Sequence, residues 1–385
     1  MANVCVRKKG GKFIAVVGFK DPEGKWRQRS RTLKATAKRA ATAEAQTFLD
    51  SLGLNADGTE RRALTVSELM DRYIDFRAPT IEPSTLSEYR RAAAHWIVPA
   101  LGGRAVSELT PETVAKWQGR LNETYSAQTC KKSLTLFRSA VRWAMNADVY
   151  TGKDPTRGVR HVRDARRQVN ALDAAGAAVV LDATGVNLSS PYMLADRLAL
   201  CAGLRKGEAC ALRWADVDVP GRALTVRRAI GRADGRGWYV KEPKTGESGR
   251  TVYFGAALVD ALEARRTRVA EAFGAAALPF NENAYVLGGI DGRFMAPVNV
   301  SNRWRALAEG LELVGTQGAR PTFHDLRHTY ATLLIGAGTD VKTVSALLGH
   351  SNAAMTLNVY ADATQDQKRR AAGAIDAVTG AVARA

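Results

Sequence analysis

Four side chains that could handle a phosphate group gather near the end of the sequence. They are His324 and Arg327 in the run HDLRHT, His350 in LLGHS, and Tyr360 in LNVY. Two imidazoles and a guanidinium can bind an anion, and a phenol can attack one as a nucleophile. The same residues could also be ordinary surface and core positions. Whether they form an anion site with a nucleophile depends on the helices and turns that hold them.

Helix signals predict that the first two share a face. Thr322 is a capping residue with Asp325 three positions later, which predicts the start of a helix that ends at a pair of glycines. Because His324 and Arg327 are three residues apart, they would lie together in its first turn. The N-terminus of a helix favours an anion at that place.

The other two residues would follow in close succession. A second short helix is predicted to end at Gly349, which leaves His350 just beyond it. A third short helix would carry Tyr360 near its end. Two tight turns between these helices could bring all four side chains together.

Two neighbouring residues have their own interpretations. His328 points to a different helix face and is interpreted as an ordinary residue. Tyr330 shares a face with Arg327 and is a rival nucleophile, although aromatic packing in the core also explains it.

Composition indicates a polyanionic partner. The 385 residues include 56 Lys and Arg against 38 Asp and Glu, a net charge of +18. Such an excess favours nucleic acid first and an acidic membrane surface second. No apolar run approaches the ~20 residues of a membrane span, and the first residues lack the apolar segment of a secretory signal. With four cysteines and no CxxC pair, a cytoplasmic protein with reduced cysteines and no membrane partner is expected.

Several classes of chemistry lack their sequence signals. There is no GxxxxGK phosphate loop, no GxGxxG after a predicted strand, no HExxH and no Cys/His cluster at zinc spacing. Acidic residues do not converge on a motif typical of a two-metal nuclease. We therefore expect no cofactor and no metal, so a reaction at a phosphodiester would depend on protein cations and a protein nucleophile.

The first 60 residues read as a small basic module of three strands and a helix. Arg27, Arg29 and Arg31 alternate with uncharged residues along the third strand, so they should share one face. A basic sheet face can enter a DNA groove. The alternative is a solvated edge strand kept from aggregating by its charge.

The rest of the chain divides into three parts. Residues 61–155 predict a helical domain, 156–170 a basic linker, and 171–385 a domain of helices with a small sheet of three short strands, the first being ALTVRRAI. The linker could wrap an anionic rod or be a plain flexible joint. One helix of the second part carries four basic residues that could follow phosphates or merely keep the helix soluble: Lys131, Lys132, Arg138 and Arg142.

Four blocks, in order, resemble the tyrosine recombinase (phage integrase) family. They are GLRKGEACALRWADVD, KEPKTGESGRTV, TFHDLRHTYAT and LLGHSNAAMTLNVY. The resemblance covers roughly residues 195–362, and the first module resembles the arm-site-binding domain of longer integrases. It implies a multidomain, mainly α fold with small β elements: an N-terminal arm-binding module of sheet and helix, a helical core-binding domain, and a mixed α/β catalytic domain.

The resemblance also implies roles for the phosphate-binding residues. Arg205 in GLRKGE and Arg327 would clamp the scissile phosphate, since a guanidinium stays charged and offers a planar fork. Tyr360 would be the nucleophile and form a 3′-phosphotyrosine bond. His324 and His350 would complete the phosphate shell, with His324 as a proton acceptor for the phenol.

Two further roles follow from the same resemblance. Lys244 would protonate the leaving 5′-oxygen; Lys241 is its rival, and the PKTG context favours Lys244. Glu208 would orient the site. Because the bond energy would be kept in the phosphotyrosine, neither ATP nor metal would be required.

The implied activity is site-specific integration or excision of a phage or mobile element. The implied partners are double-stranded DNA with core-type and arm-type sites, three further protomers in a homotetramer on DNA, a host DNA-bending protein and an excision factor. A tail helix from about Thr364 would dock on its own domain or on a neighbouring protomer. The alternatives are a Xer-like dimer resolvase, a type IB-like topoisomerase and, more distantly, a DNA-binding regulator that never cuts.

Overall fold

The computed structural model describes residues 4–21, 23–52, 54, 63–162, 168–241 and 249–349. Packing divides the chain into two compact units, 1–82 with 88–163, and 83–87 with 164–385. The prediction of a mainly helical chain with small sheets is confirmed, while the predicted domain boundaries stay predictions. In the part of the chain that is described, no helix is long and apolar enough to cross a membrane.

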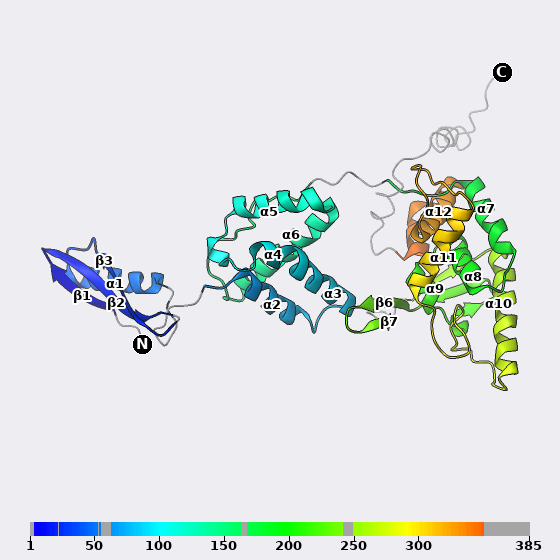
Figure 1. The fold of residues 1–385 in the computed structure, drawn as a ribbon, viewed down its shortest axis with the longest axis horizontal. Helices are drawn as coiled ribbons and strands as arrows, with labels where there is room; N and C mark the ends of the chain where they lie inside the picture. The colour runs from blue at the N-terminus through cyan, green and yellow to red at the C-terminus, as the bar shows by residue number, and fades with distance from the viewer. Residues whose placement is uncertain are drawn as a thin grey trace, which may run out of the picture. The chain divides into compact units, whose positions relative to one another are not determined.

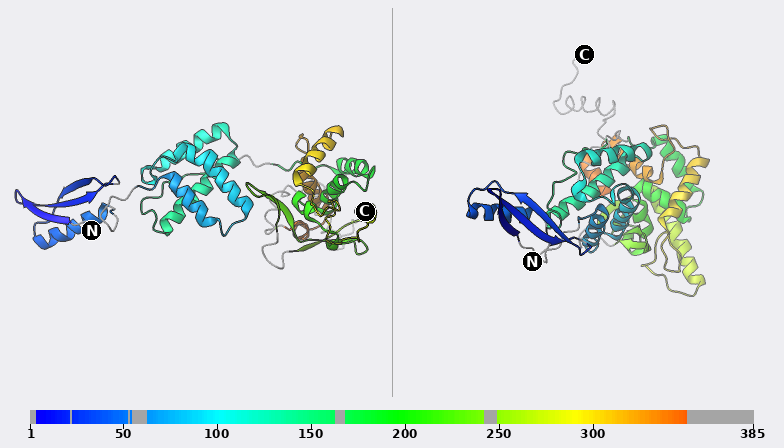
Figure 2. Two further views of the ribbon diagram at one scale, coloured as in Figure 1. Left: turned by 60° about the horizontal axis from the view of Figure 1, so that its bottom comes forward. Right: turned by 60° about the vertical axis from the view of Figure 1, so that its left-hand side comes forward.

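The chain begins with a three-stranded antiparallel sheet and one helix. Strands β1 (Val4–Lys9), β2 (Lys12–Lys20) and β3 (Trp26–Thr32) pair in that order, and α1 (Lys38–Ser51) lies along the sheet (Figure 2). Ala15 of β2 packs with Ala41 and Ala45 of α1 in a small core. The predicted three strands and helix are therefore present.

The register of β2 and β3 shows which face carries the three arginines. Residues directly opposite each other point to the same side of a sheet, and Arg27, Arg29 and Arg31 stand opposite Phe19, Val17 and Ala15. The arginines thus share a face, but it is the face on which α1 packs. All three are exposed on edge strand β3; Arg31 lies 5.9 Å above the Phe48 ring of α1, and Arg27 Nε donates to Asp21 Oδ2 at 3.0 Å. The open face instead carries Trp26, Gln28 and Ser30.

The rest of the first unit is helical. Its described elements are α2 (Val66–Arg77), the part of α3 (Pro83–Ala92) that follows residue 87, a π turn at Ala93–Ile97, α4 (Val98–Leu101), α5 (Pro111–Thr124) and α6 (Ala127–Asn146). Thr65 caps α2 through a reciprocal box with Glu68, as its sequence favours. Leu134, Phe137 and Val141 of α6 are fully buried, so the apolar stripe of this helix is core.

Helix α8 is the centre of the second unit. The helices are α7 (Ala174–Gly185), α8 (Pro191–Ala202), α9 (Lys206–Ala211), α10 (Ala256–Ala275), α11 (Pro297–Gly310), α12 (Phe323–Gly336) and α13 (Val341–Leu348) (Figure 1). Helices α7, α9, α10, α11 and α12 all contact α8. Leu194, Ala195, Leu198 and Ala199 of α8 are fully buried in the main core, which fixes the positions of α9 and α12 beside it.

The small sheet of this unit differs from the prediction. Instead of three strands, the described residues of this unit form five, in two sheets. Strands β4 (Val217–Asp218), β5 (Ala223–Val226) and β8 (Arg250–Tyr253) make up one sheet, and β6 (Ala229–Ala233) pairs with β7 (Gly237–Lys241) in the other. The run ALTVRRAI is split between β5 and β6. Its two arginines, Arg227 and Arg228, both pair with Asp216, at 3.2 and 3.0 Å, and this shared anchor holds the chain at the break between the strands.

Candidate active site

The turn between α8 and α9 presents Arg205. Helix α8 ends at Gly203, whose φ of 64° is left-handed, and a Cβ there would lie only 2.6 Å from Cδ1 of Tyr330. Both facts require glycine. Arg205 follows at the N-cap of α9, and its side chain stays 39% exposed while Nη1 donates to Glu208 Oε1 at 2.8 Å.

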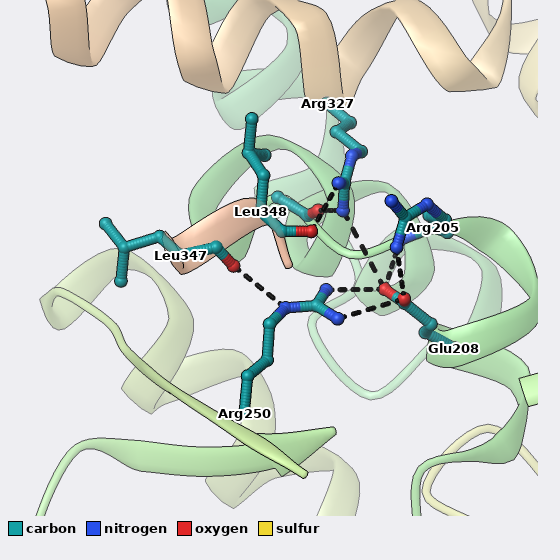
Figure 3. Close-up of polar contacts among 7 residues, drawn as sticks. Arg205, Glu208, Arg250, Arg327, Leu347 and Leu348 are labelled. Atoms are coloured by element: carbon teal, nitrogen blue, oxygen red, sulfur yellow. Dashed lines mark hydrogen bonds and ion pairs between the residues drawn. The ribbon is translucent and has the colours of Figure 1, made fainter. Parts of the chain in front are cut away.

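Glu208 is the buried anion of the site. Its carboxylate accepts from Nη1 and Nη2 of Arg250 at 3.0 and 2.6 Å, and from the backbone N–H and Nη1 of Arg205 (Figure 3). Burial would raise the pKa of Glu208, but the hydrogen bonds and charge of Arg250, with the charge of Arg205, lower it to about 2. Glu208 is therefore ionised at neutral pH and can hold the arginines around it.

Arg327 is a buried arginine. It is 2% exposed on α12, and its guanidinium donates to the carbonyls of Gly203 and Leu348. Its Nη1 also lies 3.8 Å from Glu208 Oε2. Arg327 thus joins the end of α8 to the end of α13 beside the carboxylate (Figure 3).

His324 lies in the first turn of the same helix, on the wall of a cavity. Its ring centroid is 4.8 Å from that of His328, at 82°, so His328 belongs to its surroundings. Although part of His324 is exposed, desolvation by the surrounding protein, with the charges of His328 and Arg327, lowers its pKa to about 4. The imidazole is therefore neutral at pH 7.

The cavity has a volume of about 1060 Å³ and a basic lining. Ile230, Trp304 and Phe323 supply its apolar part. Its cationic and imidazole side chains come from separate elements: Arg205, Lys206, Lys241, Arg305, Arg320 and His324. This arrangement suits a phosphate backbone. Lys206, Arg305 and Arg320 were not predicted, because nothing in the sequence indicates that α9, α11 and the start of α12 meet.

The structure brings some of the predicted catalytic residues together. Arg205, Glu208, Arg327 and His324 form one constellation, whereas Lys244, His350 and Tyr360 lie outside the described residues. Lys241, the rival of Lys244, lines the cavity.

The rival nucleophile Tyr330 is a packing residue. It is 9% exposed, and its ring lies against Gly203. Burial, with the nearby Cys201, raises the pKa of its phenol. Tyr330 does not line the cavity.

Arg250 is a further residue of the site that was not predicted. It opens β8, and besides its fork on Glu208 its Nε donates to the carbonyl of Leu347 at 2.8 Å. The only sequence signal was its place directly after the segment of Lys244, at the start of a predicted strand.

The predicted phosphate-binding residues of α6 have different surroundings. Lys131, Lys132 and Arg142 are exposed, and Lys132 Nζ lies 3.4 Å from Glu88 Oε2. Arg138 is half-buried and its Nη2 donates to the carbonyl of Val159 at 2.6 Å. Arg138 therefore anchors the chain that follows the helix. Lys131 and Arg142 are exposed to solvent, and Lys132 is exposed but paired with Glu88.

Two family models match the chain. One, the phage integrase family, matches residues 181–367. The other, the N-terminal SAM-like domain of phage integrases, matches residues 65–122. The first matched region contains Arg205, Glu208, His324 and Arg327. The second contains α2, α3, α4 and most of α5.

Relatives and solved structures agree with these models. A tyrosine recombinase XerC of a Mycobacterium species is 30% identical over 66% of this chain and 79% of its own. A XerC-like tyrosine recombinase of Caldanaerobacter subterraneus is 27% identical over 87% and 88%, and an integrase of Streptomyces ambofaciens is 25% identical over 90% and 87%. The fold is similar to that of the Tn1549 transposon integrase bound to a circular intermediate DNA (24% identity, 81% of this chain and 100% of that one, TM-score 0.68). It is also similar to a lambda integrase dimer on a core site (20% identity, 93% and 94%, TM-score 0.56).

Proposed function

Since the chain belongs to the phage integrase family of tyrosine recombinases, we propose that it breaks and rejoins DNA through a 3′-phosphotyrosine bond made by Tyr360. The chain is an enzyme of site-specific DNA recombination. The observation that carries the proposed chemistry is the cluster of Arg205, Glu208, Arg327 and His324 at a basic cavity. It supplies an oriented cation and a neutral base where a phosphate can enter.

The proposed cleavage step balances without a cofactor. The Tyr360 phenol loses its proton to neutral His324 and its oxygen bonds to phosphorus, while the bond from phosphorus to the 5′-oxygen breaks. The 5′-oxygen takes a proton from Lys244. Arg205 binds the non-bridging oxygens, with Arg327 adding its buried charge and His350 a further donor. Rejoining is the reverse step with a different 5′-hydroxyl, so the phosphodiester energy is retained.

Arg205→Lys should slow strand cleavage on the order of 10²–10³-fold, the usual cost of losing a donor to developing charge. The lysine keeps the charge but loses the planar fork. Because Arg205 is 39% exposed, the melting temperature should change little. Single-turnover cleavage of a nicked core site measures the effect.

The matched control is Arg305→Lys, which lies in the lining of the same cavity and should change the cleavage rate far less. Equal cleavage rates for wild type and Arg205→Lys would show that Arg205 does not clamp the phosphate.

We propose that the active assembly is a homotetramer on two DNA duplexes. A lambda integrase tetramer on a Holliday junction has a similar fold (20% identity, TM-score 0.54). We also propose integration or excision of a mobile element in the cytoplasm, assisted by a host DNA-bending protein and an excision factor.

Recombination is tested with a supercoiled plasmid that carries two directly repeated crossover sites. A recombinase separates it into two circles, each with one site. A type IB-like topoisomerase would only relax it, and a regulator would leave it unchanged. Relaxation without new circles, at enzyme levels that saturate both sites, would contradict the proposal.

We further propose that residues 1–60 bind a separate arm-type DNA site. Support comes from the exposed arginines of β3 and from the open sheet face with Trp26 and Gln28. A chain that starts near Arg61 should still bind and cleave core DNA but lose protection of the second site. Footprints of the full and shortened chains are the measurement; identical footprints would refute the idea. Variants Arg29→Ala and Gln28→Ala then show which sheet face contacts the DNA.

A further inference from the structure

We propose that Arg250 is a positioning residue for strand cleavage, which holds the phosphate-binding Arg205 and the end of α13 in one fixed relation. The inference rests on the proposed function. Arg250 does not act on DNA itself; it acts through Glu208 and through the helix end that directly precedes His350.

The guanidinium of Arg250 faces protein. Nε donates to the Leu347 carbonyl at 2.8 Å, and Nη1 and Nη2 donate to the two oxygens of Glu208 at 3.0 and 2.6 Å (Figure 3). The side chain is 17% exposed, compared with 39% for Arg205. An arginine that uses its fork and its Nε in this way has its planar geometry committed to the protein.

These contacts fix the position of Arg205. Nη1 of Arg250 and Nη1 of Arg205 share the same carboxylate oxygen, Oε1 of Glu208. The two-point fork prevents the carboxylate from rotating, so Arg205 is held by an oxygen whose place is fixed. The exposed remainder of Arg205 then enters the cavity in one orientation.

The same contacts also hold the C-terminal end of α13. The carbonyls of Leu347 and Leu348 accept from Arg250 and Arg327 respectively, which satisfies acceptors that a helix end otherwise leaves open. Gly349 follows with φ 63°, and a Cβ there would lie 2.9 Å from Cδ and Nη1 of Arg250. The backbone that leads into His350 is therefore packed directly on this guanidinium.

The position of Arg250 in the chain adds a third connection. It opens β8 after residues 242–248, which include Lys244. Arg250 thus follows the segment of the proposed acid in sequence, and its side chain joins the phosphate-binding arginine, through Glu208, to the helix before His350. Small displacements matter here, because a misplacement of about 1 Å can cost on the order of 100-fold in rate.

Arg250→Lys tests the role, because it keeps the charge but cannot make the fork and the Nε contact together. We expect single-turnover cleavage of a nicked core site to fall on the order of 10- to 100-fold at saturating DNA. The Kd for core DNA and its dependence on salt should stay at the wild-type values. Rates are compared per folded molecule, counted by titration with core DNA.

Arg265→Lys is the matched control. Arg265 is 8% exposed on α10 and donates to the carbonyls of Val286 and Gly288, so it is also a buried arginine that holds backbone. It should lower the melting temperature and leave the cleavage rate per folded molecule unchanged. An equal rate loss in both variants would reduce Arg250 to a general structural residue and overturn the proposal.

Two further results decide the mechanism. If Arg250 acts through Glu208, the double variant Arg250→Lys with Glu208→Gln should cleave no more slowly than the worse single variant. A weaker Kd, with a salt slope shallower by about 0.9 for one lost phosphate contact, would make Arg250 a DNA ligand instead.

A second variant covers the case in which Arg250→Lys does not fold. Gly349→Ala adds a methyl group that would crowd Arg250 without removing a polar group. It should therefore slow cleavage while the Kd for core DNA stays unchanged, and a wild-type cleavage rate would overturn the proposal. A wild-type chain that forms no adduct would overturn the proposed function and this inference with it. A wild-type adduct with an unimpaired Arg250→Lys overturns the inference alone.

Discussion

Tyr360→Phe should form no covalent adduct with DNA while binding its core site as tightly as the wild-type chain. Only the phenolic oxygen is removed, and without it no bond to phosphorus can form. The measurement is adduct yield on a nicked core site in a denaturing gel, beside a gel-shift titration of affinity.

The matched control is Tyr330→Phe. Its ring is packed against Gly203 and is 9% exposed, so loss of its hydroxyl should leave adduct formation intact. An adduct with Tyr360→Phe and none with Tyr330→Phe would reverse the assignment.

Glu208→Gln should lower the free energy of unfolding by about 3–5 kcal/mol, the usual cost of removing one partner of a buried ion pair. The amide leaves the 17%-exposed Arg250 and the 3%-exposed Arg327 without their anion. Urea unfolding at pH 7 measures the loss. Glu271→Gln is the control. Glu271 pairs with Arg268 at the i,i+3 spacing that also separates Glu208 from Arg205, but both side chains of this control pair are at least 60% exposed. The free energy of unfolding should therefore fall by only about 0–1 kcal/mol.

The effect of Glu208 should depend on pH in a defined direction. Its pKa is lowered from 4.5 to about 2 in the folded chain, so its stabilisation is fully present above pH 4.5 and is lost as the pH falls toward 2. The difference in unfolding free energy between wild type and Glu208→Gln should therefore narrow over that interval. A difference that stays constant from pH 7 to 3 would contradict the role of the ionised carboxylate.

Local signals in the sequence account for the parts of the site that one helix holds. The spacing of Thr322 and Asp325 predicted the start of α12, and the structure places His324 and Arg327 in its first turn. The same holds for Gly349, which ends α13 in a left-handed conformation. These features depend on neighbours in sequence, so a single chain reveals them.

Features that depend on packing between distant segments were not predicted. Arg250 matters because β8 lies beside α13 and the Arg250 side chain reaches Glu208 of α9, and no local pattern contains that information. The break between β5 and β6 depends on Asp216, which holds Arg227 and Arg228. Alternation along β3 showed that its arginines share a face, but only the register with β2 and the packing of α1 show which face it is.

The most direct test of the account is to identify the residue that becomes joined to DNA. The wild-type chain is trapped on a nicked core site and digested with trypsin, and the peptide that carries the nucleotide is sequenced by mass spectrometry. Cleavage after Lys342 and Lys368 places Tyr360 in a different peptide from Tyr330. The account predicts a nucleotide linked to Tyr360 through a 3′-phosphate. A link to Tyr330 or to any other residue, or no adduct from a chain that binds the site, would contradict it.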